Sequence, residues 1–117
     1  MQLTPSLDAS LNLTVMRFEL GLSRERMARL LDVSAKTIER WEQRGSAPRA
    51  TADQQRLLQI REILDLGRIV YTDEGLHLFL TTPMPVFDGS TALQMIERGE
   101  GERVFAALAT DYEGLGP

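Results

Sequence analysis

Apolar positions in residues 23–45 recur at the spacing of two short helices joined by a tight turn. In the first helix the apolar residues fall three and four positions apart, and in the second they fall three apart. Residues at this spacing share one face of a helix, so they predict a small buried core. These positions are Met27, Leu30 and Leu31 in the first helix, and Ile38 and Trp41 in the second.

The polar residues at the ends of these runs predict where each helix begins and ends. Ser23 and Ser34 are suited to cap the two helices, because a serine hydroxyl can accept a backbone N–H two or three residues on. Asp32 tolerates the left-handed backbone that a tight turn needs better than most residues do. Gly45 is a typical stop for the second helix.

The second helix, predicted from about Ala35 to Arg44, leaves a polar face outside. Two residues along a helix correspond to about 200° of rotation. Lys36 and Arg40 each lie two residues from Ile38, so both are predicted to face away from the core. Small residues followed by long hydrogen-bond donors suit the approach of a helix to the DNA major groove. Arg24, at the start of the first helix, would lie over a phosphate.

A further helix is predicted before residue 23. Leu11, Val15, Phe18 and Leu20 recur at helical spacing and would face the core, and Gly21 ends the run. Arg17 is predicted on the outer side of this helix, where solvation is a better explanation than DNA contact.

A long helix is predicted after Pro48, which cannot continue the preceding helix. Thr51 and Gln54 have the spacing of a capping box. The helix continues across Gly67 to Tyr71 and is apolar on more than one side, which indicates a central helix or one with a partner.

The remainder reads as three short helices with a proline-containing loop. Asp73 is predicted to cap the first, and Pro83 and Pro85 prevent its continuation. Ser90 or Thr91 would cap a second helix that ends at Glu97. The last helix is predicted over 100–110, with Val104, Phe105, Leu108 and Ala109 on its inner face and a glycine-rich tail after it.

Charge is distributed unevenly along the 117 residues, whose net charge is −4. Residues 1–50 hold 8 Lys and Arg against 6 Asp and Glu, and residues 51–117 hold 5 against 11. The mildly basic front suits phosphates, while the acidic remainder would repel DNA and suits a protein partner. Because the basic excess is small, we expect useful affinity only from a dimer or larger assembly on repeated half-sites.

The sequence favours a cytoplasmic binding protein over an enzyme. It has no cysteine, no run of about 20 apolar residues and no basic, apolar signal sequence at its start. His77 is the single histidine, so a histidine metal cluster is excluded and a surface position is expected. No glycine-rich phosphate loop or nucleophile–base pair is evident. We therefore predict no catalytic residue, no metal, no cofactor and no membrane association.

Residues 30–45 resemble the helix-turn-helix of the Xre family of bacterial and phage repressors. The matching residues are Leu30-Leu31, Val33-Ser34, Thr37-Ile38, Arg40-Trp41-Glu42 and Gly45. The family usually has glycine at the turn, where this chain has Asp32. An ordinary amphipathic hairpin is the alternative reading.

Residues 78–115 are similar to the C-terminal toxin-binding region of the Xre/MbcA/ParS antitoxins. The resemblance lies in Phe79-Leu80, Pro83, Phe87, Gly89, the Leu93–Ile96 helix, Gly99 to Gly101, Val104, Leu108 and the Tyr112-Glu113-Gly114 end. It implies an antitoxin of a type II pair whose partner is a RES-domain toxin that consumes NAD. Such antitoxins block the active site of the toxin and repress their own operon, and NAD belongs to the toxin.

These observations predict an all-α protein with three parts. A helix-turn-helix DNA-binding domain spans 10–50, a connecting and dimerisation helix spans 51–72, and a toxin-binding helical domain spans 73–117. The expected partners are operator DNA and a RES-domain toxin, with a homodimer inside a larger hetero-oligomer. Two alternatives stay open: a stand-alone repressor with a C-terminal dimerisation module, and an interaction protein without DNA binding.

The predicted site residues form two groups. Those expected to contact DNA are Arg24, Ser34, Ala35, Lys36, Thr37, Arg40, Gln43 and Arg44. Those expected to contact the toxin are Pro83, Phe87, Asp88, Gly89, Tyr112, Gly114 and Leu115, with Tyr112, Gly114 and Leu115 in the tail that would enter the active site.

Overall fold

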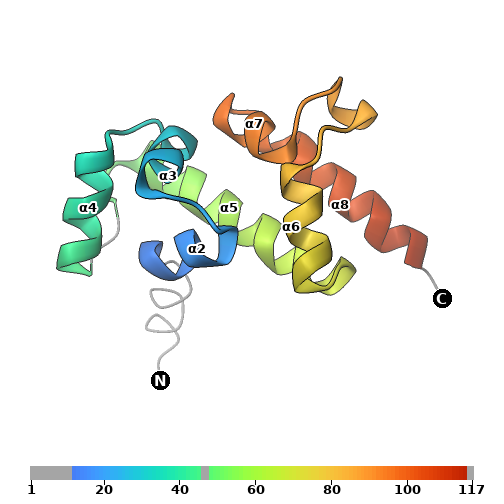
Figure 1. Cartoon of the computed structure of the whole chain (residues 1–117), viewed down its shortest axis with the longest axis horizontal. Coiled ribbons are helices and arrows are strands. Elements are labelled where there is room, and N and C mark those ends of the chain that lie inside the picture. Colours follow the sequence, from blue (N-terminus) through green and yellow to red (C-terminus); the bar gives the residue numbers. More distant parts are fainter. Residues whose placement is uncertain (1–11, 46–47, 116–117) are drawn as a thin grey trace. The chain divides into compact units, whose positions relative to one another are not determined.

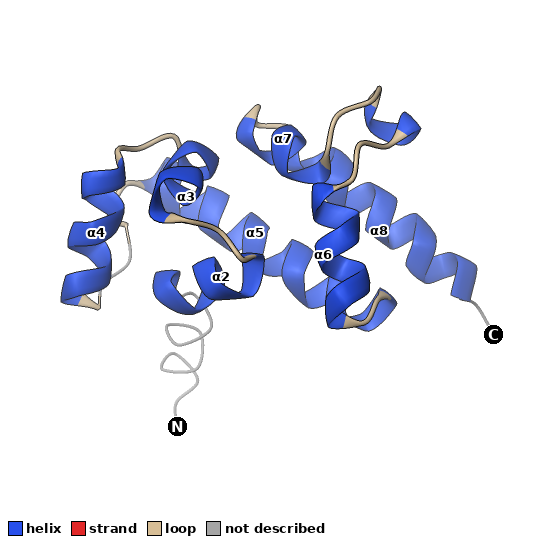
Figure 2. Cartoon of the chain, in the orientation of Figure 1, coloured by secondary structure: helices blue, strands red, loops and turns tan. Residues whose placement is uncertain are grey.

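The computed structural model describes residues 12–45 and 48–115. Every regular element in these two ranges is helical, which confirms the predicted all-α class (Figures 1 and 2). None of the described helices combines the length and the apolar character needed to cross a bilayer. The elements are α2 (Leu13–Leu20), α3 (Arg24–Leu31), α4 (Ala35–Arg44), α5 (Thr51–Val70), α6 (Asp73–Thr81), the 3-10 turn η1 (Pro85–Phe87), α7 (Ala92–Glu97) and α8 (Gly101–Leu115).

The chain divides into two compact units, Met1–Arg61 and Glu62–Pro117, and the boundary falls within α5. Unit 1 holds α2, α3, α4 and the first half of α5. Unit 2 holds the second half of α5 together with α6, η1, α7 and α8.

In unit 1, α4 packs against α3 and α2. Ile38 supplies the apolar anchor of α4 and is fully buried. Burial of a side chain of this size stabilises a fold by about 1.5–3 kcal/mol. Trp41, predicted to face inward, is half-buried. The buried apolar residues of unit 1 are Leu13, Met16, Leu20, Met27, Ala28, Leu30, Leu31, Ile38, Leu57 and Ile60.

The predicted inner face of α2 was wrong at Val15 and Phe18 and was confirmed at Leu20. Leu13, Met16 and Leu20 are buried, whereas Val15 is 49% and Phe18 69% exposed. Leu11 lies outside the described residues. Two apolar stripes compete in this segment, and the side chain of Asn12, which accepts from the backbone N–H of Val15, starts the helix at Leu13.

The orientation of α2 also turns two charged side chains inward. Arg17, predicted on the outer side, bonds to Glu42 of α4, and Glu19 bonds to Arg61 of α5 at 2.9 Å. All four of these side chains are at most 15% exposed. Such pairs need both partners because an unpaired buried charge is costly. The spacing of apolar residues in the sequence does not indicate which charged residues form such pairs.

The predicted ends of α3 and α4 and the predicted C-terminus of α2 are confirmed, whereas the predicted cap of α5 was wrong. Ser23 and Ser34 cap α3 and α4, and their hydroxyls accept from Arg26 N and Thr37 N at 3.1 Å. Gly21 and Gly45 end α2 and α4 in left-handed conformation. α5 runs to Val70 across Gly67, but Thr51 is its first helical residue rather than its cap.

Two left-handed helix ends in unit 1 allow a matched stability test. Asp32 ends α3 at φ 57° and Gly45 ends α4 at φ 62°. Because a side chain disfavours this conformation, Gly45→Ala should lower the free energy of unfolding by about 1 kcal/mol, and Asp32→Gly should raise it by up to about 1 kcal/mol. Urea titration of both variants measures these changes. Equal effects of the same sign would contradict the argument.

In unit 2, α7 packs against α6 and α8. Gly67 of α5 lets α6 approach closely, since a Cβ at this position would collide with Leu76 Cδ1. The Phe79 ring lies between Tyr71 and Phe87, with centroid distances of 5.5 and 6.2 Å. The buried apolar residues of unit 2 are Ile63, Leu64, Leu76, Phe79, Leu80, Phe87, Ala92, Leu93, Met95, Ile96, Val104 and Leu108.

Some predictions for unit 2 were confirmed and others were wrong. Thr91 caps α7 and forms a capping box with Gln94. α6, however, is capped by Thr72 rather than by Asp73, because the Thr72 hydroxyl accepts from Gly75 N.

The C-terminal helix is longer than predicted, because α8 continues to Leu115. Val104 and Leu108 are buried as predicted, whereas Phe105 is 38% exposed and Ala109 is half-buried. The tail residues Tyr112, Gly114 and Leu115 are therefore the last turn of a helix and not a free loop.

Candidate functional site

The turn between α3 and α4 is held by backbone and side-chain hydrogen bonds. Asp32 adopts φ 57° and ψ 47°, and its N–H donates to the carbonyls of Ala28 and Arg29. Two residues later the Ser34 hydroxyl, which caps α4, also lies 2.8 Å from the Thr37 hydroxyl. The Asp32 bonds close the end of α3, and the Ser34 and Thr37 hydroxyls fix the start of α4. The N-terminal end of α4 therefore has a defined geometry.

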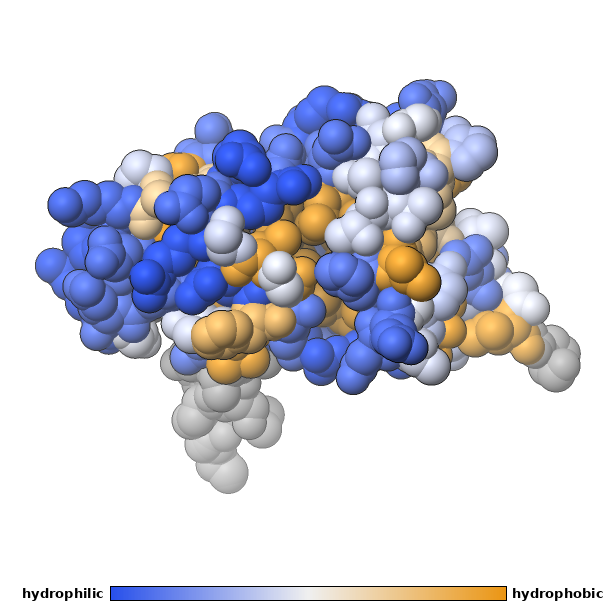
Figure 3. All heavy atoms as spheres, in the orientation of Figure 1, coloured by the Kyte–Doolittle hydropathy of each residue, from blue (hydrophilic) through white to orange (hydrophobic). Residues whose placement is uncertain are grey.

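The outward face of α4 carries the cations that the sequence analysis assigned to DNA contact. Lys36, Arg40 and Gln43 are exposed, and Ala35 and Thr37 are half-buried. An open hollow on this face is lined by Lys36, Glu39, Arg40 and Gln43. Figure 3 shows a predominantly hydrophilic surface over α4, at the left of the view. The predicted donors are thus brought together on one accessible face, and Ser34 and Arg44 are exposed near its two ends.

A buried carboxylate ties the three helices of this region together. Glu42 of α4 is 5% exposed and accepts from Arg17 Nε at 2.6 Å and from Arg24 Nε at 2.8 Å. Arg17 also donates to the carbonyl of Leu22 at 3.1 Å. Since Arg17 lies on α2 and Arg24 on α3, the cluster fixes α4 against both helices. Sequence analysis missed this cluster, and a glutamate next to the inward-facing Trp41 was the signal that could have indicated it.

Arg24 is held at the surface by this cluster. Its side chain is 47% exposed, and Glu42 fixes its Nε. The predicted phosphate contact would therefore come from a pre-positioned guanidinium, and it stays a prediction.

The cluster also sets the pKa of Glu42. Burial alone would raise it, but the hydrogen bonds and charges of Arg17 and Arg24 outweigh burial, so the pKa of Glu42 is lowered from its usual value. The ionised, bonded form is the one present in the fold at neutral pH.

In unit 2 a short, closed loop separates α6 from α7. The N–H of Met84 donates to Ser90 O at 3.1 Å, and the N–H of Gly89 donates to Met84 O at 3.0 Å. Asp88 and Gly89 have φ of 56° and 88°, so the chain reverses direction there. Phe87 is 1% exposed and anchors the loop, while its neighbour Val86 is 56% exposed.

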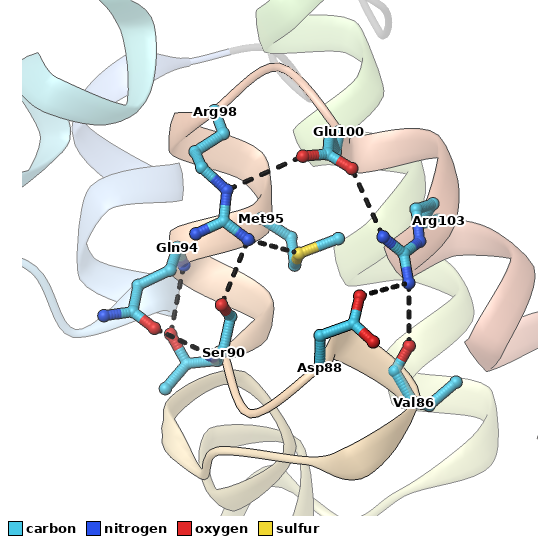
Figure 4. A network of polar contacts seen from close by, with 9 residues as sticks. Val86, Asp88, Ser90, Gln94, Met95, Arg98, Glu100 and Arg103 are labelled. Carbon is cyan, nitrogen blue, oxygen red and sulfur yellow. Dashed lines mark hydrogen bonds and ion pairs between the residues drawn. The ribbon is translucent and has the colours of Figure 1, made fainter.

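Two arginines of unit 2 hold this loop from outside (Figure 4). Arg103 of α8 donates to the carbonyl of Val86 at 2.9 Å and pairs with Asp88 at 3.6 Å. Arg98 donates to the Ser90 hydroxyl at 3.0 Å. Glu100 lies between the arginines and pairs with both, at 3.6 and 3.3 Å. The loop is therefore pre-shaped, which reduces the entropy lost if a partner binds it.

Most of the residues predicted to contact a toxin lie at the surface. Phe87 is the exception, because its buried ring can act only through the shape of the loop. Val86, which is not among the predicted residues, is the exposed apolar residue of the loop. The exposed members of the predicted set are Pro83, Asp88, Gly89, Tyr112, Gly114 and Leu115.

A second open hollow runs along α6 and is lined by Asp73, Glu74, His77 and Leu78. His77 is exposed, as predicted. Among the described residues no group of three or more His, Cys, Asp or Glu side chains is placed to hold a metal ion.

Tyr71 fixes the extended part of α8 and provides a test of this geometry. Its hydroxyl donates to Asp111 Oδ2 at 2.7 Å. This hydrogen bond, followed by burial and the Asp111 charge, raises the pKa of Tyr71 to about 12. The stabilisation is present below the usual tyrosine pKa of about 10 and is lost as the pH rises through about 12.

We expect Tyr71→Phe to abolish the ionisation of tyrosine near pH 12, read from ultraviolet absorbance, and to cost about 1 kcal/mol of stability. Tyr112→Phe, which removes the other tyrosine, serves as the control and should keep it. Ionisation of Tyr71 near its usual pKa of about 10 in Tyr112→Phe, where it is the remaining tyrosine, would rule out the bond to Asp111.

Comparison with known proteins gives a match in fold. Neither the protein-family profiles nor the curated proteins match this sequence. Among solved structures, the crystal structure of the M. tuberculosis MbcT–MbcA toxin–antitoxin complex contains a chain with a TM-score of 0.71 to this one and 20% sequence identity. The alignment covers 93% of this chain and 97% of that chain. This protein therefore shares, over nearly its whole length, the fold of a chain from a toxin–antitoxin complex.

Proposed function

We propose that the chain is the antitoxin of a type II toxin–antitoxin pair. The observation that carries this proposal is the likeness of fold to a chain of the MbcT–MbcA complex over 93% of the sequence. The resemblance of residues 78–115 to the toxin-binding region of Xre/MbcA/ParS antitoxins points in the same direction. In this proposal the partner is a RES-domain toxin that consumes NAD, and NAD and the chemistry belong to the toxin.

Unit 1 supplies the second part of the proposed function, which is repression of its own operon. α4 offers Lys36, Arg40 and Gln43 on an exposed face, with its orientation fixed by Glu42. Long donors of this kind bond to base edges and phosphates in the major groove. The small basic excess of residues 1–50 supports binding as a homodimer on two half-sites, with residues 51–72 as the connecting and dimerisation helix.

Unit 2 supplies the proposed contact with the toxin. Val86 projects from a loop that Arg103 and Arg98 hold in place, and Tyr112 and Leu115 are 50% and 61% exposed on the last turns of α8. Exposed apolar side chains on a pre-shaped surface bind partners tightly, because little entropy is lost on binding. We propose that this surface covers the entrance to the active site of the toxin, in the cytoplasm.

Co-expression with the adjacent toxin gene in a bacterial host tests the antitoxin role. The chain should restore growth and co-purify with the toxin. A toxin that stays lethal and yields no complex would refute the role. If the adjacent reading frame encodes no toxin while the chain binds DNA, the antitoxin role gives way to the alternative of a stand-alone repressor with a C-terminal dimerisation module.

A matched pair of valines tests which surface contacts the toxin. Val86→Asp should weaken the complex by about 1–3 kcal/mol, because it places an uncompensated charge in an apolar contact. Val15→Asp on α2 makes the same chemical change at a similar exposure, 49% against 56%, and should leave the toxin affinity unchanged. Calorimetric titration of toxin with each variant gives the comparison, and equal affinities would exclude the loop as a contact.

A further inference from the structure

One acidic residue lies among the donors on the outward face of α4. Lys36, Glu39, Arg40 and Gln43 follow one another at intervals of three, one and three residues and line the same open hollow. Lys36, Arg40 and Gln43 can donate hydrogen bonds from their side chains, whereas an ionised glutamate can only accept. Glu39 is therefore chemically different from every other residue around it.

The position of Glu39 has no evident structural explanation. The second glutamate of α4, Glu42, has a nearly buried side chain that accepts hydrogen bonds from two arginines. Glu39 is half-buried, and within the described part of the chain its carboxylate makes no hydrogen bond or ion pair. It acts on Arg24 only through its charge. A negative charge on a surface that faces phosphates weakens DNA binding in general. A carboxylate at this position is therefore better explained by a hydrogen bond to a particular base.

Base edges in the major groove differ in what they offer a carboxylate. Cytosine presents an amino donor at N4 without a neighbouring acceptor, whereas guanine presents two acceptors and thymine presents a carbonyl and a methyl group. A carboxylate accepts a hydrogen bond from cytosine and is repelled by the acceptors of guanine and thymine. Adenine carries an amino donor beside the acceptor N7, so it is a poorer match.

We propose that Glu39 is a specificity-determining residue that accepts a hydrogen bond from the N4 amino group of a cytosine in each operator half-site. The inference rests on the proposed DNA-binding function and deepens it. Lys36 and Arg40 supply affinity on either side, and Glu39 excludes guanine and thymine at one position.

Selection of binding sites from randomised duplex DNA, with the purified full chain, tests this assignment. The wild-type chain should select cytosine at one position of each half-site. Glu39→Ala should lose the preference at that position alone, with discrimination falling by about 5- to 100-fold. Glu39→Gln should change the preference to adenine, because a glutamine amide pairs with N6 and N7 of adenine.

Glu102→Gln on α8 controls for net charge, since Glu102 is exposed and the change in charge is the same. It should keep the wild-type site. Circular dichroism of the Glu39 variants verifies that the helices remain folded.

Three results are decisive. A lost or switched preference at a single position supports the inference. An unchanged site in both folded Glu39 variants overturns it and leaves DNA binding intact. A wild-type chain that enriches no duplex sequence and binds no duplex at low salt overturns the proposed function and this inference together.

Discussion

Replacement of Lys36 and Arg40 together by alanine is expected to weaken operator binding by about 2–6 kcal/mol, the largest effect that we predict for any variant. Each side chain is exposed on the outward face of α4, so neither substitution removes a buried contact. A side chain that bonds to a base edge contributes about 1–3 kcal/mol, and the loss of a phosphate contact lowers the salt dependence of binding by about one ion. Fluorescence anisotropy with labelled operator DNA at several salt concentrations measures both quantities.

The matched control for this variant is Arg98→Ala with Arg103→Ala in unit 2. It removes the same two positive charges, and both arginine side chains are about half exposed. The control should bind operator DNA as the wild type does. Equal losses in the two double variants would show that net charge rather than the α4 face governs binding.

Replacement of Glu42 by alanine should destabilise unit 1 by about 3 kcal/mol. Removal of the carboxylate leaves Arg17, which is 13% exposed, with its charge unpaired, and this is far more costly than loss of a surface ion pair. Chemical denaturation followed by circular dichroism measures the change. Arg24→Ala removes a 47% exposed partner of the same carboxylate and should destabilise the unit far less than Glu42→Ala does, because solvent screens an exposed ion pair.

Acid unfolding provides an independent measurement on the same cluster. Because the pKa of Glu42 is lowered in the folded protein, its contribution is present above the ordinary glutamate pKa and is lost as the pH falls through the lowered value. We expect the stability of the wild type to fall over this acidic range more steeply than that of Glu42→Gln. Identical pH profiles would mean that the cluster contributes nothing to stability.

Local backbone chemistry explains why the helix ends of unit 1 could be predicted from sequence. Ser23 and Ser34 cap helices, and Gly45 ends one, through hydrogen bonds to residues within a few positions. The exposure of Lys36 and Arg40 followed from the helical period alone. These features depend on short segments, so no knowledge of the remaining chain was needed.

Features that depend on contacts between distant segments could not be predicted in this way. The pairing of Arg17 with Glu42 and the extension of α8 past Thr110 involve partners at least 25 residues away in sequence. The buried face of α2 depends on a choice between two competing apolar stripes. Likewise, an alternation of apolar letters does not reveal that Phe87 is buried while Val86 is exposed. That distinction requires the loop closed by Met84, Gly89 and Ser90.

In the proposed function, DNA and the toxin bind to different units of one chain. Size-exclusion chromatography with light scattering, applied to a mixture of the chain, the toxin and an operator duplex, tests it most directly. We predict a single species that contains all three components, with a mass above that of either binary complex. Displacement of the DNA by the toxin, or failure of the chain to bind either one, would contradict the assignment of the two ligands to separate units.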